Sequence, residues 1–393
     1  MAKARYTKRP DGRWETKVWD GTYRKGHKHY VTLYSTKSSR DLEQKKLAYE
    51  TARQQGKITV KSVDSVAAYA KKWLKIYKAP REKNTYAMYE NIINKHLGII
   101  GRLTFEQLNH SLIQELVNDV LDKPRICQQL VLTMKQVVRA AERDRLLPRG
   151  ASLDLFADLA LPKYTPTEKR ALTAQEKDAI SRADLTDRER AFVLTIFYTG
   201  VRRGEALALT KKDLSFSTHM LSITKAVAFD KNDPYIKSPK SENGVRDIPM
   251  PPGMVKFMRR YLAQLPGDML FCKLNGEPMT KSSYDKMWAS IQKKLTAAYQ
   301  KAWEAEQKAS GVDLREAGEP DWGTVGFEDL TAHVFRHNYC TSLCYQMIQG
   351  GRISFKKIAE LLGDTEKMVM EVYNHIIEEQ EDASGVVAAA VNL

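Results

Sequence analysis

The sequence lacks the features of membrane and secreted proteins. It has no apolar run near the ~18 residues that a membrane-spanning helix needs, no signal peptide and no lipidation motif. Cysteine is scarce: of four, only Cys340 and Cys344 lie close together in the sequence, four residues apart as on one helix face. Zinc would need more ligands at closer spacings. We therefore expect reduced, mostly buried thiols, no metal, and a cytoplasmic protein.

Acidic residues are the minority among the charged side chains. There are 48 Asp and Glu against 63 Lys and Arg, which gives a net charge of +15. Such a field attracts polyanions, and with no membrane segment the expected partner is nucleic acid. The length of 393 residues exceeds what one hydrophobic core usually serves, so two or three domains are expected.

Residues 1–61 form a basic head, with sixteen Lys and Arg against six Asp and Glu. Alternating aromatic and β-branched residues at 13–19 and 29–34, with turn signals at Asp11-Gly12 and Asp20-Gly21, predict about three strands, followed by a helix near 39–54. The cation density fits contact with DNA phosphates. Alternatively, the aromatics only form a small core under a solvated face. The candidate DNA-binding residues are Arg13, Trp14, Lys17, Arg24, Lys25, Lys28 and Tyr30.

Residues 62–150 have helical periodicity throughout. Apolar residues recur every three or four positions from Val63 to Tyr77, and further helices are expected near 84–97, 104–122 and 127–145, with Asn84 or Thr85 as a cap. This predicts an all-helical domain. A basic run beside it is either a solvated helix face or a DNA contact; the candidates are Lys71, Lys72, Lys83, Thr85 and Tyr86.

A proline-containing linker, 151–167, precedes a last domain at 168–393. Thr173-x-x-Glu176 is a capping-box pattern that opens its first helix. Short β segments are expected at 220–227, 235–240 and 245–250, with a turn at 241–244, and the remainder is helical. The fold class is thus multidomain α+β: a small sheet with a helix, an all-helical domain, and a mainly α domain with a small sheet.

The last domain carries residues suited to phosphodiester chemistry. On a helix, Arg202 can meet Glu205, and His333 can share a face with Arg336. Arginine stays charged and offers two parallel hydrogen bonds to phosphate oxygens. Lys240 can release a proton and so act as general acid. A tyrosine phenol has a pKa near 10 in water, and neighbouring cations favour its phenolate, which makes Tyr373 a candidate nucleophile.

In order and spacing this set resembles the tyrosine recombinases, in particular the integrases of phages and conjugative transposons. The motifs that carry the resemblance are Gly200-Val201-Arg202-Arg203-Gly204-Glu205, Lys240 before Arg246-Asp247-Ile248-Pro249, His333-Val334-Phe335-Arg336-His337, Leu361-Leu362-Gly363-Asp364 and Tyr373-Asn374-His375. The resemblance is detailed over 168–393. For the residues before 168 the resemblance lies only in the order of the domains, with an arm-binding head followed by a core-binding helical domain.

The resemblance implies a mechanism and its residues. Tyr373 would attack the scissile phosphate to give a 3′-phosphotyrosine, which a partner 5′-hydroxyl then resolves through a Holliday junction. Arg202 and Arg336 would hold the phosphate, Lys240 would protonate the leaving oxygen, and His333 would assist. The energy of the broken phosphodiester bond is conserved in the 3′-phosphotyrosine bond, so no cofactor, metal or ATP is implied. Arg203 is a rival for the position of Arg202.

One position departs from the family pattern. Asp364 stands where the family most often has His or Trp, and an ionised carboxylate cannot donate to phosphate. Either Asp364 is protonated or turned away, with another donor replacing it, or catalysis is weaker; it is kept as a catalytic candidate. Glu205 and His337 are supporting candidates, although a structural role is favoured for His337 and His375.

The expected function is site-specific recombination of a mobile element by a tetramer on double-stranded DNA with core and arm sites. An excisionase or DNA-bending protein is a further expected partner, and the protein would be associated with the nucleoid of a bacterial host. The alternatives are a type IB topoisomerase and a DNA-binding regulator on a decayed recombinase scaffold. After Tyr373, an acidic run and the apolar tail 386–393 are expected to pack on a neighbouring subunit or on their own domain.

Overall fold

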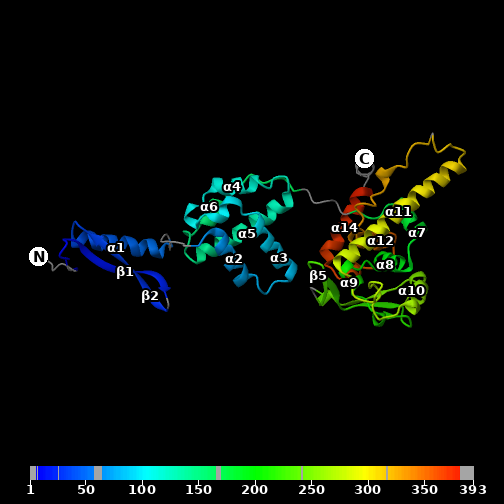
Figure 1. Cartoon of the computed structure of the whole chain (residues 1–393), viewed down its shortest axis with the longest axis horizontal. Helices are drawn as coiled ribbons and strands as arrows, with labels where there is room; N and C mark the ends of the chain where they lie inside the picture. Colours follow the sequence, from blue (N-terminus) through cyan, green and yellow to red (C-terminus); the bar gives the residue numbers. More distant parts are fainter. Residues whose placement is uncertain are drawn as a thin grey trace, which may run out of the picture. The chain divides into compact units, whose positions relative to one another are not determined.

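The computed structural model describes residues 6, 8–24, 26–56, 64–164, 170–239, 242–315 and 317–380, and among these the side chains of 22–24, 242 and 378–380 are left aside. The chain divides into two compact units, Met1–Pro166 and Thr167–Leu393 (Figure 1). None of the helices among the described residues is long and apolar enough to cross a membrane.

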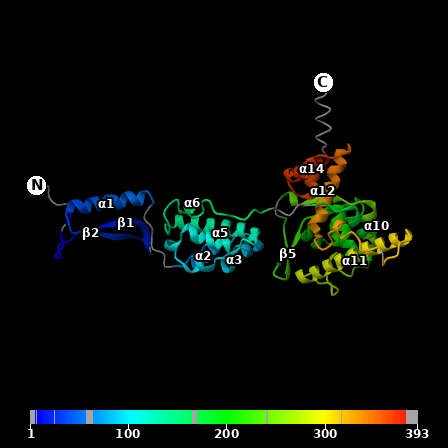
Figure 2. The same cartoon turned by 90° about the horizontal axis from the view of Figure 1, so that it is seen from above.

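The described residues of the head form two antiparallel strands, β1 (Trp14–Arg24) and β2 (His27–Ser35), and one helix, α1 (Ser39–Gln54), which runs along one face of the strand pair (Figures 1 and 2). The helix prediction for 39–54 is confirmed, and Ser38 caps it. The prediction of about three strands is wrong for the described residues. Asp20-Gly21 makes no turn, because Gly21, at φ 89°, lies where the register shifts within β1.

The helical domain contains four longer helices and short helical turns. The elements are α2 (Val66–Tyr77), α3 (Lys83–Lys95), η1 (Gly98–Arg102), η2 (Phe105–Gln107), α4 (His110–Asn118), α5 (Pro124–Arg143) and α6 (Ala151–Leu155). Their apolar faces meet in one core that includes Trp73, Phe105, Met134 and Leu155. The expected linker at 151–167 therefore begins with α6, which contributes to this core.

The predicted cap of the second helix is wrong. Asn84 and Thr85 lie inside α3, whose N-cap is Glu82, and no side chain caps it by a hydrogen bond. Helix α4 is also shorter than the expected 104–122, because the first residues of that range form η2 and a connecting loop.

The second unit is mainly helical. Its helices are α7 (Ala174–Arg182), α8 (Asp187–Thr199), α9 (Arg203–Leu207), α10 (Pro252–Gln264), α11 (Lys281–Ala309), α12 (Ala332–Ile348), α13 (Phe355–Leu362) and α14 (Glu366–Gln380), with 3-10 turns η3 (Lys211–Asp213), η4 (Glu242–Gly244) and η5 (Trp322–Thr324). The predicted capping box at Thr173 and Glu176 is confirmed. A large core gathers around Phe192, Phe271 and Phe335. A smaller core joins α12, α13 and α14.

Two small sheets are also present in the described part of this unit. Strands β3 (Leu214–Ser215), β4 (Met220–Ile223) and β7 (Arg246–Pro249) form one, and β5 (Ala226–Asp230) with β6 (Asp233–Lys237) forms the other. The prediction of one strand over 220–227 is wrong, since the chain leaves the first sheet after Ile223 and enters the second at Ala226. Likewise β6 and β7 do not pair with each other. Gly204 lies against β5, where a Cβ would be 2.4 Å from the Val227 carbonyl oxygen.

Candidate active site

The first part of the site lies where α8 ends and α9 begins. Gly200 ends α8 at φ 59°, and a Cβ there would lie 2.5 Å from the ring of Tyr339, so only glycine fits. Arg202 is the N-cap of α9. The Glu205 carboxylate accepts hydrogen bonds from the Arg202 backbone N–H at 2.9 Å and from its Nη1 at 3.0 Å. The pairing expected from their spacing is therefore present and fixes the guanidinium.

A third arginine, Arg246, supports this pair from β7. Its Nη2 lies 2.8 Å from Glu205 Oε2, its Nε donates to the Leu361 carbonyl at 2.8 Å, and its Nη1 donates to the Gly244 carbonyl at 3.1 Å. The Arg246 side chain is only 5% exposed. One guanidinium thus ties together α9, the end of α13 and the turn that precedes β7.

No role was predicted for Arg246, although the alternation of residues along its strand already indicated that its side chain is buried. Strand residues alternate between faces, so Arg246 shares the inward face of β7 with Ile248, and the structure buries both. A charged residue in phase with a core position of a strand needs a buried partner. That partner is Glu205.

Arg336, the second arginine predicted to hold the phosphate, comes from α12. It is 6% exposed, and its Nη1 donates to the Gly200 carbonyl at 3.0 Å. Its Nη2 donates to Asp364 Oδ2 at 2.9 Å, and Arg202 Nη2 donates to the same oxygen at 3.0 Å. The two arginines that the motifs single out, 134 positions apart in the sequence, therefore converge on one acceptor atom.

Electrostatics keep these groups charged at neutral pH. Burial alone would raise the pKa of Glu205, but Arg246 and Arg202 hold it below its ordinary value. The pKa of Asp364 is shifted in the same direction. Burial would raise it, but hydrogen bonds from Arg336 and the Thr365 backbone lower it. The alternative of a protonated Asp364 is therefore disfavoured. Burial and the neighbouring Arg202 lower the pKa of Arg336 to about 10, which leaves it protonated at pH 7.

Tyr373 lies on α14, which starts two residues after Asp364. Its ring is half-buried and meets Phe355 of α13 edge-on, with 5.0 Å between ring centroids. Over the parts of the chain that the structure describes, no residue forms a hydrogen bond with its hydroxyl. Among the described residues the phenol is thus held by packing, and its helix connects directly to the turn that carries Asp364.

The other candidates are placed differently. His333 is exposed in the first turn of α12, one turn before Arg336. His337 and His375 line a separate cavity of about 430 Å³, together with Lys177, Asn338 and Tyr345. Lys240 falls outside the described residues, as does the tail 386–393. The structure therefore brings together Arg202, Glu205, Arg336 and Asp364, and adds Arg246. Arg203 points elsewhere: its guanidinium lies over the ring of Tyr284, 5.2 Å from the centroid.

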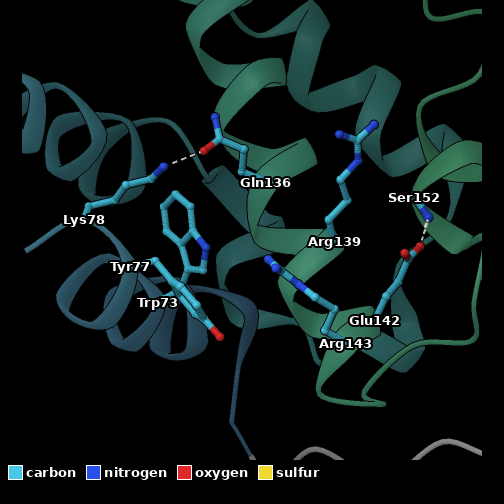
Figure 3. A pocket seen from close by; sticks show the side chains of 8 residues that line it. All are labelled: Trp73, Tyr77, Lys78, Gln136, Arg139, Glu142, Arg143 and Ser152. Atoms are coloured by element: carbon cyan, nitrogen blue, oxygen red, sulfur yellow. Dashed lines mark hydrogen bonds between the residues drawn. The ribbon is translucent and has the colours of Figure 1, made fainter. Parts of the chain in front are cut away.

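The helical domain has a basic, aromatic hollow of about 650 Å³ between α2 and α5 (Figure 3). Tyr77 at the end of α2 and Lys78, which caps that helix, border one side, and Arg139 and Arg143, one turn apart on α5, border the other. The Lys78 ammonium donates to Gln136 Oε1 at 2.7 Å, and the Arg143 guanidinium lies 5.7 Å from the Tyr77 ring centroid. Both arginines are exposed. Sequence reasoning missed these arginines, because a 20-residue amphipathic helix reveals its polar face but not what that face borders.

The DNA-binding candidates of this domain lie elsewhere on it. Lys71, Lys72 and Lys83 are exposed, while Thr85 and Tyr86 are half-buried. Lys72 is paired with Asp64, at 2.5 Å between Nζ and Oδ2.

In the head, strand alternation sorts the candidates by face. Arg13 and Lys17 lie on the face opposite Val18, which is buried under α1, and the register places Lys28 and Tyr30 on that same open face. Trp14 lies on the face of Val18. The Arg13 guanidinium stacks over Tyr34, 5.1 Å from the ring centroid. The side chain of Arg24 and all of Lys25 are outside the described residues.

Comparison with known proteins decides the family. The model of the phage integrase family matches residues 169–380, more than half of the chain. The chain belongs to the phage integrase family. The prediction of a tyrosine recombinase, an enzyme of DNA recombination, is thereby confirmed. The match covers every residue of the arginine cluster and Tyr373.

Relatives among characterised sequences include recombinases and transposases. Tyrosine recombinase XerD of Corynebacterium glutamicum is 24% identical over 248 residues, which are 61% of this chain and 68% of that protein. The transposase from transposon Tn916 of Enterococcus faecalis is 26% identical over 189 residues, 44% of this chain and 41% of that protein. A putative prophage phiRv2 integrase of Mycobacterium tuberculosis is 31% identical over 93 residues, 24% of each chain.

Solved structures share the fold. The Tn1549 transposon integrase in complex with a circular intermediate DNA superposes with a TM-score of 0.62 at 20% identity, over 79% of this chain and 95% of that one. A lambda integrase dimer bound to a core site superposes with a TM-score of 0.52 at 16% identity, over 94% of each chain. These similarities confirm the multidomain α+β fold class.

Proposed function

We propose that this protein integrates and excises a mobile DNA element by site-specific recombination. The observation that carries the proposal is the convergence of Arg202 and Arg336 on a single acceptor oxygen, at 3.0 and 2.9 Å. Two guanidinium groups so placed match the non-bridging oxygens of one phosphodiester. The helix of Tyr373 begins beside them, so a nucleophile and a phosphate site lie on adjacent elements. The mobile element is proposed from the relatives named as a prophage integrase and a transposase.

In the first step, the phenolic oxygen of Tyr373 attacks phosphorus and the bond to the 5′-oxygen breaks. The products are a 3′-phosphotyrosine and a free 5′-hydroxyl. Arg202 and Arg336 stabilise the negative charge that develops on the phosphorane. We assign Lys240 as the donor of the proton that the leaving 5′-oxygen takes up, and His333 as the residue that assists proton transfer from Tyr373 or holds the phosphate.

In the second step, the 5′-hydroxyl of a partner duplex attacks the phosphotyrosine, forms a new phosphodiester bond and returns the phenol. One bond is exchanged for another of the same kind, so neither ATP nor metal enters the balance. Two rounds pass through a Holliday junction and use four subunits. Lambda integrase, which shares the fold, has been solved as a tetramer bound to a Holliday junction with a TM-score of 0.51.

We assign DNA binding to three parts of the chain. The catalytic domain and the helical domain hold the core site, the latter through the hollow with Arg139 and Arg143. The open face of the head sheet, with Lys17 and Lys28, holds a second, distal site. Linked weak sites reinforce each other through effective concentration. We expect an excisionase or DNA-bending protein to set the direction of the reaction.

The test uses two duplexes that each carry a candidate element end, incubated with the full chain without magnesium or ATP. A recombinase yields joint molecules with strands from both duplexes. A type IB topoisomerase relaxes supercoiled plasmid but joins no strands between duplexes, and a decayed regulator binds the ends without cutting them. Joint products that are lost in Tyr373→Phe support the proposal. Relaxation alone, or tight binding without any cleavage, contradicts it.

A further inference from the structure

The acceptor position between Arg202 and Arg336 is occupied by the side chain of Asp364. Oδ2 of Asp364 accepts hydrogen bonds from Arg202 at 3.0 Å and from Arg336 at 2.9 Å. Its other oxygen, Oδ1, accepts from the Thr365 backbone N–H at 3.1 Å. A carboxylate resembles one edge of a phosphate: both present two anionic oxygens that a guanidinium fork can bind. Asp364 therefore satisfies the donors that the phosphodiester would use.

We propose that Asp364 is an internal anion that takes the place of the scissile phosphate on Arg202 and Arg336 and leaves it when DNA binds. The inference rests on the proposed function, which assigns these arginines to the phosphate. It makes Asp364 a gating residue rather than a catalytic one. In the DNA-free state Asp364 keeps the two like-charged arginines together, and on DNA the phosphate takes over that task.

The surroundings allow Asp364 to leave. Its side chain is 29% exposed, whereas that of Arg336 is 7% exposed. Asp364 directly follows Gly363, which ends α13 at φ 61°, and precedes the exposed Thr365. A rotation of the Asp364 side chain toward solvent breaks its two hydrogen bonds with the arginines and the one that its Oδ1 accepts from the Thr365 backbone N–H. By contrast, the arginines are anchored on their other nitrogens, Arg202 by Glu205 and Arg336 by the Gly200 carbonyl.

Charge gives this exchange a direction. The cluster of Arg202, Arg246, Arg336, Glu205 and Asp364 holds three positive and two negative groups. With Asp364 in place, a phosphate meets a site whose remaining charge is small. Free inorganic phosphate must displace Asp364 unaided, but DNA also binds through many other contacts, and that binding energy can displace it. Displacement of Asp364 therefore favours a phosphodiester within bound DNA over small free anions.

The opposite role is a carboxylate that stays in place to orient the arginines during catalysis. The two roles differ in the sign of an effect. Removing the charge of a gate lowers the stability of the free protein yet strengthens phosphate binding. Removing the charge of an organiser weakens both. Asp364→Asn tests this, since the amide has the same shape, keeps a carbonyl oxygen and is weakly bound by arginine.

The first readout is the binding of inorganic phosphate to the full chain, measured by titrating the thermal midpoint. Asp364→Asn is expected to lower the midpoint without phosphate by roughly 2–4 °C and to tighten the apparent dissociation constant for phosphate about five- to tenfold. Glu360→Gln is the matched control. Its carboxylate is exposed on α13 and paired with Lys357, so it changes the net charge equally without touching the arginines. Its phosphate constant should stay within about twofold of the wild type.

The second readout is the rate of covalent adduct formation on nicked duplexes at subsaturating DNA, which should rise about threefold or more in Asp364→Asn and in Asp364→Ser. Weaker phosphate binding together with slower adduct formation in both variants would overturn the gate and establish an organiser. No change in either readout would also overturn it. If no variant and no wild type forms an adduct while phosphate binding still tightens, the gate stands and the proposed function fails. The second variant guards against a folding defect peculiar to the first.

Discussion

Arg246 and Glu205 form a buried ion pair with 2.8 Å between Nη2 and Oε2, although 41 positions separate them in the sequence. Both side chains are 5% exposed. The pair joins β7 to α9, and Glu205 in turn holds Arg202. The orientation of Arg202, which we propose binds the phosphate, thus depends on an arginine that faces the interior.

Replacing Arg246 by Gln should therefore damage both folding and function. Glu205 would lose its buried partner, and the carbonyls of Leu361 and Gly244 would lose their donor. We expect the free energy of unfolding to fall by about 3 kcal/mol, the range for breaking a buried ion pair. Urea unfolding measures this. Arg260→Gln, in which an exposed arginine at 3.7 Å from Asp187 is lost, should change it by less than about 1 kcal/mol. Equal effects of the two would refute the role of Arg246.

Gly363 should tolerate no side chain. At φ 61° any other residue is strained, and a Cβ would lie 2.7 Å from Arg246 Nη1 and 2.9 Å from the Asn243 carbonyl oxygen. Gly363→Ala is expected to destabilise the protein by about 2 kcal/mol and to slow adduct formation, because it displaces Arg246. Gly253→Ala is the control: nothing lies within 4 Å of its Cβ position in α10, so it should be neutral or slightly stabilising in the same unfolding experiment.

Glu189 should make stability depend on pH in the acid range. Burial alone would raise its pKa, but Lys294, Ser290 and the Thr186 backbone lower it to about 2. A carboxyl whose pKa is depressed on folding contributes stability above its unfolded pKa, near 4.5, and loses it as pH falls toward 2. Glu189→Gln should thus cost roughly 2–3 kcal/mol at pH 7. The difference from the wild type should shrink steadily in urea titrations below pH 4.5. A constant difference across pH would show that the charge of Glu189 is not responsible.

Arg139 and Arg143 should contribute to DNA affinity without contributing to sequence choice. Each substitution by Ala removes one exposed cation from the hollow of the helical domain. We expect weaker binding to all sequences and a slope of log affinity against log salt reduced by about 1 per arginine. Fluorescence anisotropy over a salt series gives the slope. Lys95→Ala, an exposed cation on α3 outside the hollow, should leave the slope unchanged. An equal loss in Lys95→Ala would indicate a diffuse field instead of a defined contact.

Local signals predicted part of the fold. The helix at 39–54 and the capping box at Thr173 follow from short-range chemistry, and the structure has both. Long-range pairing was not predictable in this way: the strand after Ile223 joins another sheet, and Gly21 makes a bulge rather than a turn. Both depend on what the segments pack against, which a local pattern does not contain.

In the site, too, contacts between residues close in the sequence could be predicted and contacts between distant residues could not. The spacing of Arg202 and Glu205 within one helical turn predicted their contact, and the structure has it. The convergence of Arg336 and Asp364 depends on how α12 packs against the turn after α13, and no spacing in the sequence encodes that distance. The sequence raised the question of Asp364, and the geometry shows it engaged with both arginines.

The identity of the residue that becomes covalently linked to DNA decides whether Tyr373 is the nucleophile of a recombinase. The full chain is incubated with a nicked duplex carrying candidate element ends, without magnesium or ATP, and the adduct is digested and sequenced by mass spectrometry. We predict a nucleotide on the peptide containing Tyr373, its absence in Tyr373→Phe, and its persistence in Tyr345→Phe, whose ring lines the separate cavity beside α12. Attachment at another residue, or no adduct on DNA that the wild type binds, would contradict the account.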